Sequence, residues 1–182
     1  MIILGIDPGT TAIGFAVLKS GRPPRLVDAG LIPVHAADTA ERLAELHRGL
    51  SRVIKTAKPD AAAVEKLFFA KNTKTAMAVA EARGAILLTA ALARVSVYEY
   101  APAEIKKIVT GDGAADKKAI RKMVLLTLPE TENLKARDDV FDAIAAALAC
   151  HFMEFNKRPL QHKVEINPHT FPWGILGRCR DK

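Results

Sequence analysis

The stretch MIILGIDPGTTAIGFAVLKS, residues 1–20, decides the fold. Residues 2–6 form an apolar run typical of a buried central strand, and residues 13–18 resume the strand pattern after a Pro-Gly turn. Asp7 stands at the end of the first of these strands. Burying a carboxylate without a partner is very costly, so this side chain must be hydrated, paired or bound to a cation.

Strand and helix patterns alternate along the chain to about residue 155. Residues 25–34 predict a third strand that completes an antiparallel meander, and residues 61–65 and 95–100 predict two more strands. Helices are predicted at 39–57 with Thr39 as the cap, at 72–93, from 102 to a turn at 111–113, at 116–128 and at 137–155. This order predicts an α/β fold, a mixed five-stranded sheet with helices on both faces.

The composition excludes several classes of protein. Hydrophobic residues make up 49% of the 182 residues, so the chain is not disordered throughout. No apolar run reaches the ~18 residues needed to span a bilayer, and the N-terminus lacks the features of a signal peptide. Cys150 and Cys179 match no zinc-binding spacing, and they predict a reducing, cytoplasmic location without membrane association.

We expect one domain over residues 1–155, followed by a basic tail over residues 156–182. The tail contains prolines, aromatic residues and scattered charge, and no periodic pattern is sustained along it. It either lies along the domain surface or docks on a partner, and the sequence leaves its role open.

The net charge of +7, from 27 basic and 20 acidic residues, points to a nucleic-acid partner mainly through its distribution. Residues 104–122 hold six basic side chains against three acidic ones. Lys66, Lys71 and Lys74 follow directly after Glu65. Basic groups beside an acidic site are expected where a polyanion must be brought to it, although a solvated helix face produces a similar pattern.

Carboxylates at three places in the sequence predict a divalent-metal centre. Asp7 and Glu65 each end a predicted strand, and Asp139 and Asp142 lie three residues apart on one face of the last helix. If the two strands are neighbours and the helix packs across them, the four side chains converge. Mg²⁺ or Mn²⁺ would relieve the resulting repulsion, because both prefer carboxylate and water ligands. Two such ions about 4 Å apart suit in-line phosphodiester hydrolysis.

Helix capping is the alternative role for Asp138, Asp139 and Asp142. Acidic side chains near a helix N-terminus are favoured without any metal. Asp142 fits this role less well, because it lies in a helix that is apolar nearly all round and is therefore expected to be buried. Glu65 alone is a common kind of strand-end acid, so both interpretations stay open at this point.

Five segments, in the same order, resemble the bacterial Holliday-junction resolvases of the RuvC family. They are GIDPGTTAIGFAVL (5–18), VEKLFFAKNTKTA (64–76), EARGAILLTAA (81–91), EYAPAEIKKIVTGDGAADKKAI (99–120) and DDVFDAIAAALACH (138–151). The resemblance covers roughly residues 1–155 and finds no clear counterpart for the tail.

The resemblance implies a ribonuclease-H-like fold, a homodimer and two Mg²⁺ ions per subunit, for which Mn²⁺ would substitute. It places the four acidic residues of the family on Asp7, Glu65, Asp139 and Asp142, with Asp138 as a second candidate for the third place. The implied activity is that of a crossover junction endodeoxyribonuclease, which resolves four-way DNA junctions by paired symmetric nicks in recombination and repair. The preferred cleavage sequence, and whether a branch-migration helicase is a partner, stay open.

The resemblance also implies which side chains contact DNA. Phe68 best matches an aromatic residue that contacts junction bases, and Lys106 and Lys117 match basic positions that contact DNA. Charge and position add four neighbouring basic residues: Lys71, Lys107, Lys118 and Arg121.

Small side chains recur every four residues on the helix predicted at 72–93. Ala76, Ala80 and Gly84 form a stripe that permits close approach of another helix. Packing within the subunit would explain the stripe, and the resemblance favours a dimer interface built from this helix.

Three other functions compete with a junction-cleaving enzyme. The turn at residues 7–11 also resembles the first phosphate loop of the actin and sugar-kinase superfamily, but 182 residues cannot supply its two large lobes. A non-catalytic junction-binding module would lack a carboxylate, and all four places are filled. An RNA-processing enzyme on the same fold would differ in cutting structured RNA in preference to branched DNA.

Overall fold

The structure is a computed structural model that describes residues 1–9, 11–66, 73–132, 134 and 136–155. Its strands are β1 (Ile2–Asp7), β2 (Ala12–Lys19), β3 (Arg25–Pro33), β4 (Ala61–Glu65) and β5 (Ser96–Tyr100). They form one sheet in the order β3-β2-β1-β4-β5. β2 runs antiparallel to β1 and β3, whereas β4 runs parallel to β1 and β5. The predicted mixed five-stranded sheet is confirmed.

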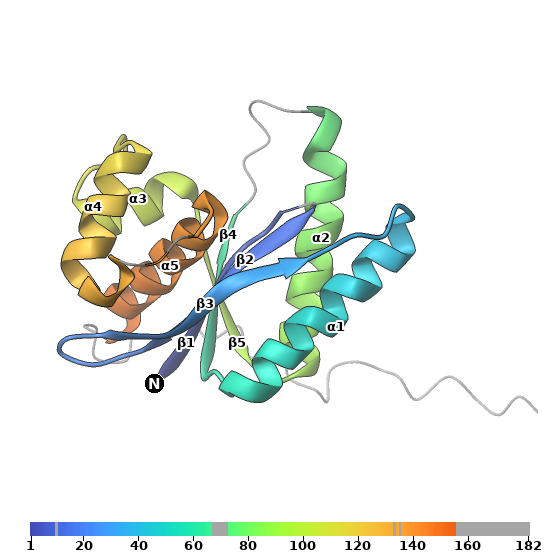
Figure 1. The fold of residues 1–182 in the computed structure, drawn as a ribbon, viewed down its shortest axis with the longest axis horizontal. Helices are drawn as coiled ribbons and strands as arrows, with labels where there is room; N and C mark the ends of the chain where they lie inside the picture. Colours follow the sequence, from blue (N-terminus) through green and yellow to red (C-terminus); the bar gives the residue numbers. More distant parts are fainter. Residues whose placement is uncertain (10, 67–72, 133, 135, 156–182) are drawn as a thin grey trace, which may run out of the picture.

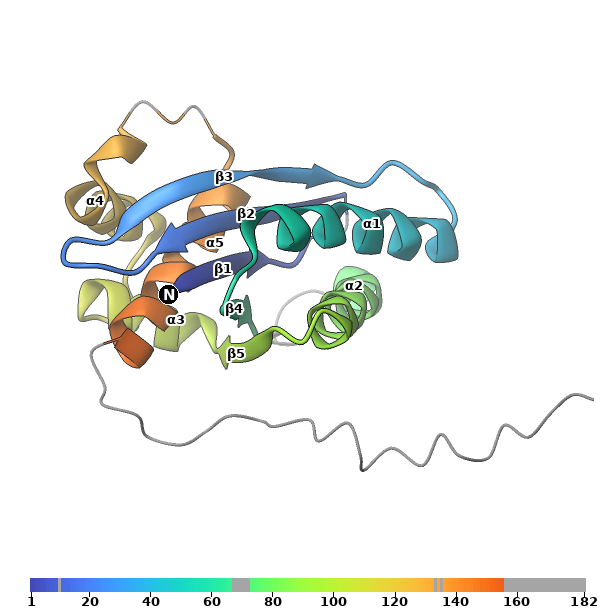
Figure 2. The same cartoon turned by 90° about the horizontal axis from the view of Figure 1, so that it is seen from below.

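Helices cover both faces of this sheet, as Figure 1 and Figure 2 show. One face carries α1 (Thr39–Ala57) and α2 (Thr73–Leu92), and the other carries α3 (Pro102–Thr110), α4 (Lys117–Thr127) and α5 (Asp138–Cys150). A 3-10 turn, η1 (Pro129–Thr131), follows α4, and a π-helix, η2 (His151–Phe155), follows α5. The apolar side chains accordingly form two cores, one on each face of the sheet.

The start of α1 differs from the prediction, because Asp38 and not Thr39 caps the helix. The Asp38 carboxylate accepts a hydrogen bond from the backbone N–H of Glu41, with a donor–acceptor distance of 3.0 Å. A carboxylate in this place satisfies a free N–H of the first turn and interacts favourably with the helix dipole. Two polar residues stand side by side at this boundary, and the pattern of apolar residues could not choose between them.

The end of the last helix also differs from the prediction of one α-helix to residue 155. α-Helical geometry ends at Cys150 and the wider π-helical turn η2 continues to Phe155. His151 is buried at this change, and its Nδ1 lies 3.2 Å from the hydroxyl of Ser20 at the end of β2. A single turn is too short for apolar spacing to separate these two helix types.

Two glycines allow α5 to lie directly on the central strands. A Cβ added to Gly14 on β2 would lie 2.0 Å from the carbonyl oxygen of Asp139, and one added to Gly5 on β1 would lie 2.0 Å from that of Ala143. Side chains at these two places would hold the helix away from the sheet. The first turn of α5 therefore sits close to the end of β1 because residues 5 and 14 have no side chain.

Replacing Gly14 with Ala is expected to destabilise the protein by about 1–3 kcal/mol, since the new methyl group must push α5 outward. Thermal or urea unfolding measures the change. The matched control is Gly30→Ala on β3, where the nearest atoms to an added Cβ are ring atoms of the Phe15 side chain, at 3.2 Å and 3.4 Å, and no backbone atom. That change should alter stability by less than Gly14→Ala does, because a side chain can shift where a backbone carbonyl cannot. Equal stability of Gly14→Ala and wild type would show that α5 does not press on β2.

Among the described residues, the longest and most apolar helices still fall short of what a membrane span requires.

Candidate active site

The ends of β1 and β4 bring two carboxylates to the same edge of the sheet. β1 and β4 are parallel neighbours in which Ile6 pairs with Val64. The next residue on each strand is an acid, Asp7 on β1 and Glu65 on β4. Both acids therefore leave the sheet side by side, at the carboxyl ends of two adjacent parallel strands.

The first two turns of α5 supply the other acidic candidates, and none of them is the helix cap. The N-cap residue is Arg137, whose side chain makes no capping hydrogen bond. The Asp138 side chain is 66% exposed, whereas those of Asp139 and Asp142 are 34% and 30% exposed. None of these aspartates is therefore a side-chain cap, although Asp138 and Asp139 lie in the first turn, where the helix dipole favours acids. Asp139 and Asp142 are the less exposed of the three.

The electrostatics of Asp7 show that the carboxylates converge. Burial raises the pKa of Asp7 from 3.8 to about 7, and Asp142, Glu65 and Asp139 add to the increase in that order. Lys117 opposes them. Coulombic effects of this kind act over several ångströms, so the three acids lie in the same region of the molecule as Asp7. We call these four residues, Asp7, Glu65, Asp139 and Asp142, the acidic centre.

Two other members of the acidic centre are perturbed in the same direction. Burial raises the pKa of Glu65 above its usual range, and Asp142 adds to the increase, whereas Lys106 and Lys117 oppose it. Burial also raises the pKa of Asp142, against the effect of Lys117. Burial is thus the main cause of the raised pKa in all three residues, and the neighbouring charges modify it.

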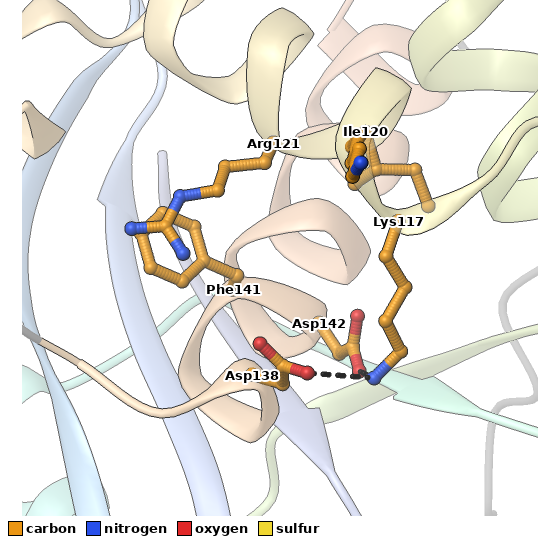
Figure 3. Close-up of a pocket in the computed structure, with 7 residues that line it drawn as sticks. Lys117, Ile120, Arg121, Asp138, Phe141 and Asp142 are labelled. Atoms are coloured by element: carbon orange, nitrogen blue, oxygen red, sulfur yellow. Dashed lines mark hydrogen bonds and ion pairs between the residues drawn. The ribbon is translucent and has the colours of Figure 1, made fainter.

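Lys117 lies against the acidic centre at the start of α4, which is capped by Asp116. Its Nζ is 3.3 Å from Oδ2 of Asp138 and 3.4 Å from Oδ2 of Asp142 (Figure 3). One ammonium group thus links two carboxylates of α5. The neighbouring aspartates differ in their contacts. Asp138 binds Lys117, whereas Asp139 binds Arg137, with 3.3 Å between Nη2 and Oδ2, and also raises the pKa of Asp7.

The donor set of the acidic centre fits a hard divalent cation. In the described part of the chain, no three His, Cys, Asp or Glu side chains are arranged closely enough to hold a metal ion as they stand. Asp7 and Glu65 nevertheless end adjacent parallel strands, and Asp7, Glu65 and Asp142 have raised pKa values that a bound cation would reverse. Carboxylate oxygens with room for water are the ligands that Mg²⁺ and Mn²⁺ prefer.

A small pocket of about 150 Å³ lies beside the acidic centre, between α4 and α5. Its lining includes Lys117, Lys118, Arg121, Asp138, Phe141 and Asp142. The Arg121 guanidinium carbon lies 4.2 Å from the centre of the Phe141 ring, and Figure 3 shows the two groups stacked. This contact holds a permanent positive charge in a defined place next to the carboxylates.

The remaining basic candidates lie on α3 and α4. Lys106 on α3 is partly buried and close enough to Glu65 to lower its pKa, whereas Lys107 and Lys118 are exposed. The predicted base-contacting residue Phe68, the predicted DNA contact Lys71 and the tail 156–182 lie outside the described residues.

The predicted small-residue stripe of α2 only partly coincides with its exposed face. Gly84 is exposed, while Ala76 and Ala80 are partly buried beside that face. The large apolar side chains that α2 exposes are Met77, Leu88 and Leu92. With Gly84 they are spaced by seven, four and four residues, so they form one apolar face of the helix.

Sequence reasoning missed three residues that shape the site. Gly5 and Gly14 seat α5, and the only signal available was an alternation of glycine with apolar residues in both strands. Phe141, which contacts Arg121, is the third missed residue. The sequence did carry a signal for the contact between α4 and α5. Lys117 and Arg121 are four residues apart on α4, as are Asp138 and Asp142 on α5, so each pair shares a helix face.

Comparison with known proteins agrees with this fold. A family model described as "Crossover junction endodeoxyribonuclease RuvC" matches residues 3–151. The curated protein of that name from Chloroflexus aggregans is 46% identical over 153 residues, which cover 83% of this chain and 92% of the relative. The one from Halothermothrix orenii is 42% identical over 153 residues, with the same coverage.

Two solved structures extend the likeness to three dimensions. The Thermus thermophilus RuvC structure superposes with a TM-score of 0.78 at 30% identity, covering 86% of this chain and 96% of that one. The T. thermophilus RuvC in complex with Holliday junction substrate superposes with a TM-score of 0.77 at 33% identity, covering 84% and 94%. This chain therefore belongs to the RuvC family of crossover junction endodeoxyribonucleases.

Proposed function

We propose that this protein is a structure-selective endonuclease that resolves four-way DNA junctions by paired symmetric nicks, in recombination and repair. The observation that carries the proposal is the convergence of four carboxylates at the joint end of β1 and β4, with basic side chains beside them. The relative solved with Holliday junction substrate supports the choice of DNA substrate.

The metal cofactor we propose is a pair of Mg²⁺ ions per subunit, with Mn²⁺ able to substitute. Asp7, Glu65, Asp139 and Asp142 would hold them. Asp138 is the weaker candidate, because its side chain is more exposed than those of Asp139 and Asp142 and it does not contribute to the raised pKa of Asp7. When bound, such ions activate the attacking water and stabilise the leaving oxygen of an in-line displacement, which leaves a 5′-phosphate and a 3′-hydroxyl.

The basic side chains of α3 and α4 would hold the DNA strand against the acidic centre. Lys117 is placed to exchange its two aspartate partners for a phosphate, because a cation bound at Asp142 would compete with it. Arg121 is pre-oriented by Phe141, so it loses little freedom on binding a phosphate. Exposed Lys107 and Lys118 extend the contact, and we propose Phe68 and Lys71 as further contacts. Binding is expected to weaken strongly with salt.

We also propose that the protein is a homodimer that packs through α2. The apolar face of Met77, Gly84, Leu88 and Leu92 supports this, because so many large apolar side chains on one helix face are unusual at a solvent surface. A two-fold dimer suits a four-way junction, since two equivalent strands must be cut symmetrically. We further propose a branch-migration helicase as a partner and a cytoplasmic location. We also propose that residues 156–182 form a tail separate from the domain.

Replacing Leu88 with Glu is expected to convert the dimer into monomers, since two charges would be buried at the two-fold interface. Light scattering after gel filtration measures the mass. The matched control is Val27→Glu. Val27 is an equally exposed apolar residue on β3, which forms one edge of the sheet, opposite the edge formed by β5. A monomeric Leu88→Glu should also lose the pairing of the two nicks. A dimer of undiminished stability would show that α2 is not the interface.

Cleavage of a labelled four-way junction tests the function directly, with linear duplex of the same sequence and structured RNA as comparisons. We expect symmetric nicks in the junction alone, in Mg²⁺ or Mn²⁺, and no cutting in EDTA. Binding without cutting in both metals would favour a non-catalytic module, and preferential cutting of RNA would favour an RNA-processing enzyme. The absence of binding would contradict the proposal altogether.

A further inference from the structure

A groove on α4 lies next to the pocket at the acidic centre and shares two lining residues with it. It has a volume of about 440 Å³, within the range of ligand-binding sites. It is lined by Lys118, Arg121, Lys122, Leu125, Leu126 and Pro129. We call it the α4 groove. Glu132 is the one acid among the described residues that line it. Glu132 follows η1 and so lies beyond the C-terminal end of α4.

The face of α4 that lines the groove differs from the face that packs into the hydrophobic core. Ile120, Val124 and the following Leu128 are buried in the core. The groove residues 118, 121, 122, 125 and 126 recur at spacings of three and four, and therefore share another face. Leu126 is 66% exposed on this face. The groove is thus basic along the first half of the helix and apolar along the second half.

The α4 groove is continuous with the pocket at the acidic centre. Lys118 and Arg121 line both of them. The rise of 1.5 Å per helical residue separates Lys117 from Leu126 by about 14 Å. That distance corresponds to at most about four nucleotides of a strand with 3.4 Å per stacked base. A strand with one phosphate at the acidic centre would therefore reach the groove within a few nucleotides of the cut.

We propose that the α4 groove binds an unstacked nucleotide of the DNA strand that is cut, a few positions from the cut. Lys118, Arg121 and Lys122 contact its phosphates, and the base lies against Leu125 and Leu126. A base inside a duplex is stacked on its neighbours, so it reaches these side chains only where the stack is open, as at a branch point. This inference rests on the proposed function and adds a reason for selecting branched DNA.

A protein segment with acidic and apolar side chains would also match the groove in charge and polarity. Its docking would cover Lys118 and Arg121, which border the acidic centre and face the path of the substrate. The continuity between the two cavities therefore favours the DNA strand as the occupant.

Leu126→Asp in the full chain tests the proposal, because an exposed side chain can be replaced without unfolding the protein. The probes are a series of four-way junctions, each carrying the fluorescent base 2-aminopurine at one of four positions on either side of the cut. Each junction is bound in EDTA so that it is not cleaved. We expect a fluorescence change at one position with wild type, its loss with Leu126→Asp, and about tenfold weaker junction binding. Lys122→Ala should reduce the salt dependence of binding by about one phosphate contact.

Val27→Asp is the matched control, since it places the same charge on another exposed apolar residue, on β3. It should retain the fluorescence change and the junction affinity, and circular dichroism checks that both variants are folded. If wild type cuts the junction while Leu126→Asp keeps the signal and the affinity, the groove inference is wrong and the proposed function stands. The groove inference is also wrong if Leu126→Asp binds the junction as wild type does but no longer binds a protein partner of the wild type. If wild type neither binds nor cuts the junction, both fail.

Discussion

Asp7→Asn is expected to lower the rate of junction cleavage by at least about 10³-fold, while leaving junction binding intact. Asp7 ends the central strand and is the member of the acidic centre on which the other three act. An amide has nearly the same shape but no charge, and it binds a hard cation more weakly than a carboxylate does. Loss of about 4 kcal/mol of transition-state stabilisation corresponds to that factor.

Single-turnover cleavage in Mg²⁺ measures this rate, and gel shift in EDTA measures binding. Binding should be unchanged or slightly tighter, because the variant removes a negative charge near the phosphates. Asp28→Asn is the matched control, since Asp28 is an exposed acid on β3. Cleavage at the wild-type rate by Asp7→Asn would remove Asp7 from the proposed metal site. Loss of binding together with cleavage would indicate a structural role instead.

The metal-free protein is expected to lose on the order of 3 kcal/mol of stability as the pH rises from 5 to 8. The fold raises the pKa of Asp7 from 3.8 to about 7, so between these values the folded state binds more protons than the unfolded state. Stability therefore falls as the pH rises through this window and levels off above about 7. The pKa values of Glu65 and Asp142 are raised too, and they act in the same direction.

Urea unfolding in EDTA across this pH range measures the effect. Asp7→Asn should flatten the profile and be more stable than wild type at pH 8, because its side chain stays neutral. Mg²⁺ should restore stability to wild type at pH 8 by binding the folded state, and should do less for the variant. A profile that is the same for both proteins would show that the fold does not raise the pKa of Asp7.

Most of the secondary structure could be predicted because its signals are local. The apolar runs of β1 and β2, the spacing in α1 and the glycine-containing turn before α4 each act over a few residues. Errors arose at boundaries, where Asp38 replaced Thr39 as a cap and the last helix changed to π geometry at His151. At such places the competing conformations differ in one hydrogen bond, and tertiary contacts decide between them.

The sequence by itself determined which residue types stand at the ends of β1, β4 and α5, and that basic side chains cluster on α4. Those are properties of order along the chain. Only the tertiary structure decided that β4 pairs with β1, that Gly5 and Gly14 let α5 lie against them, and that Lys117 faces Asp138 rather than Asp139. These depend on contacts between residues far apart in the sequence, where close packing and charge repulsion act between elements and leave no periodic pattern along the chain.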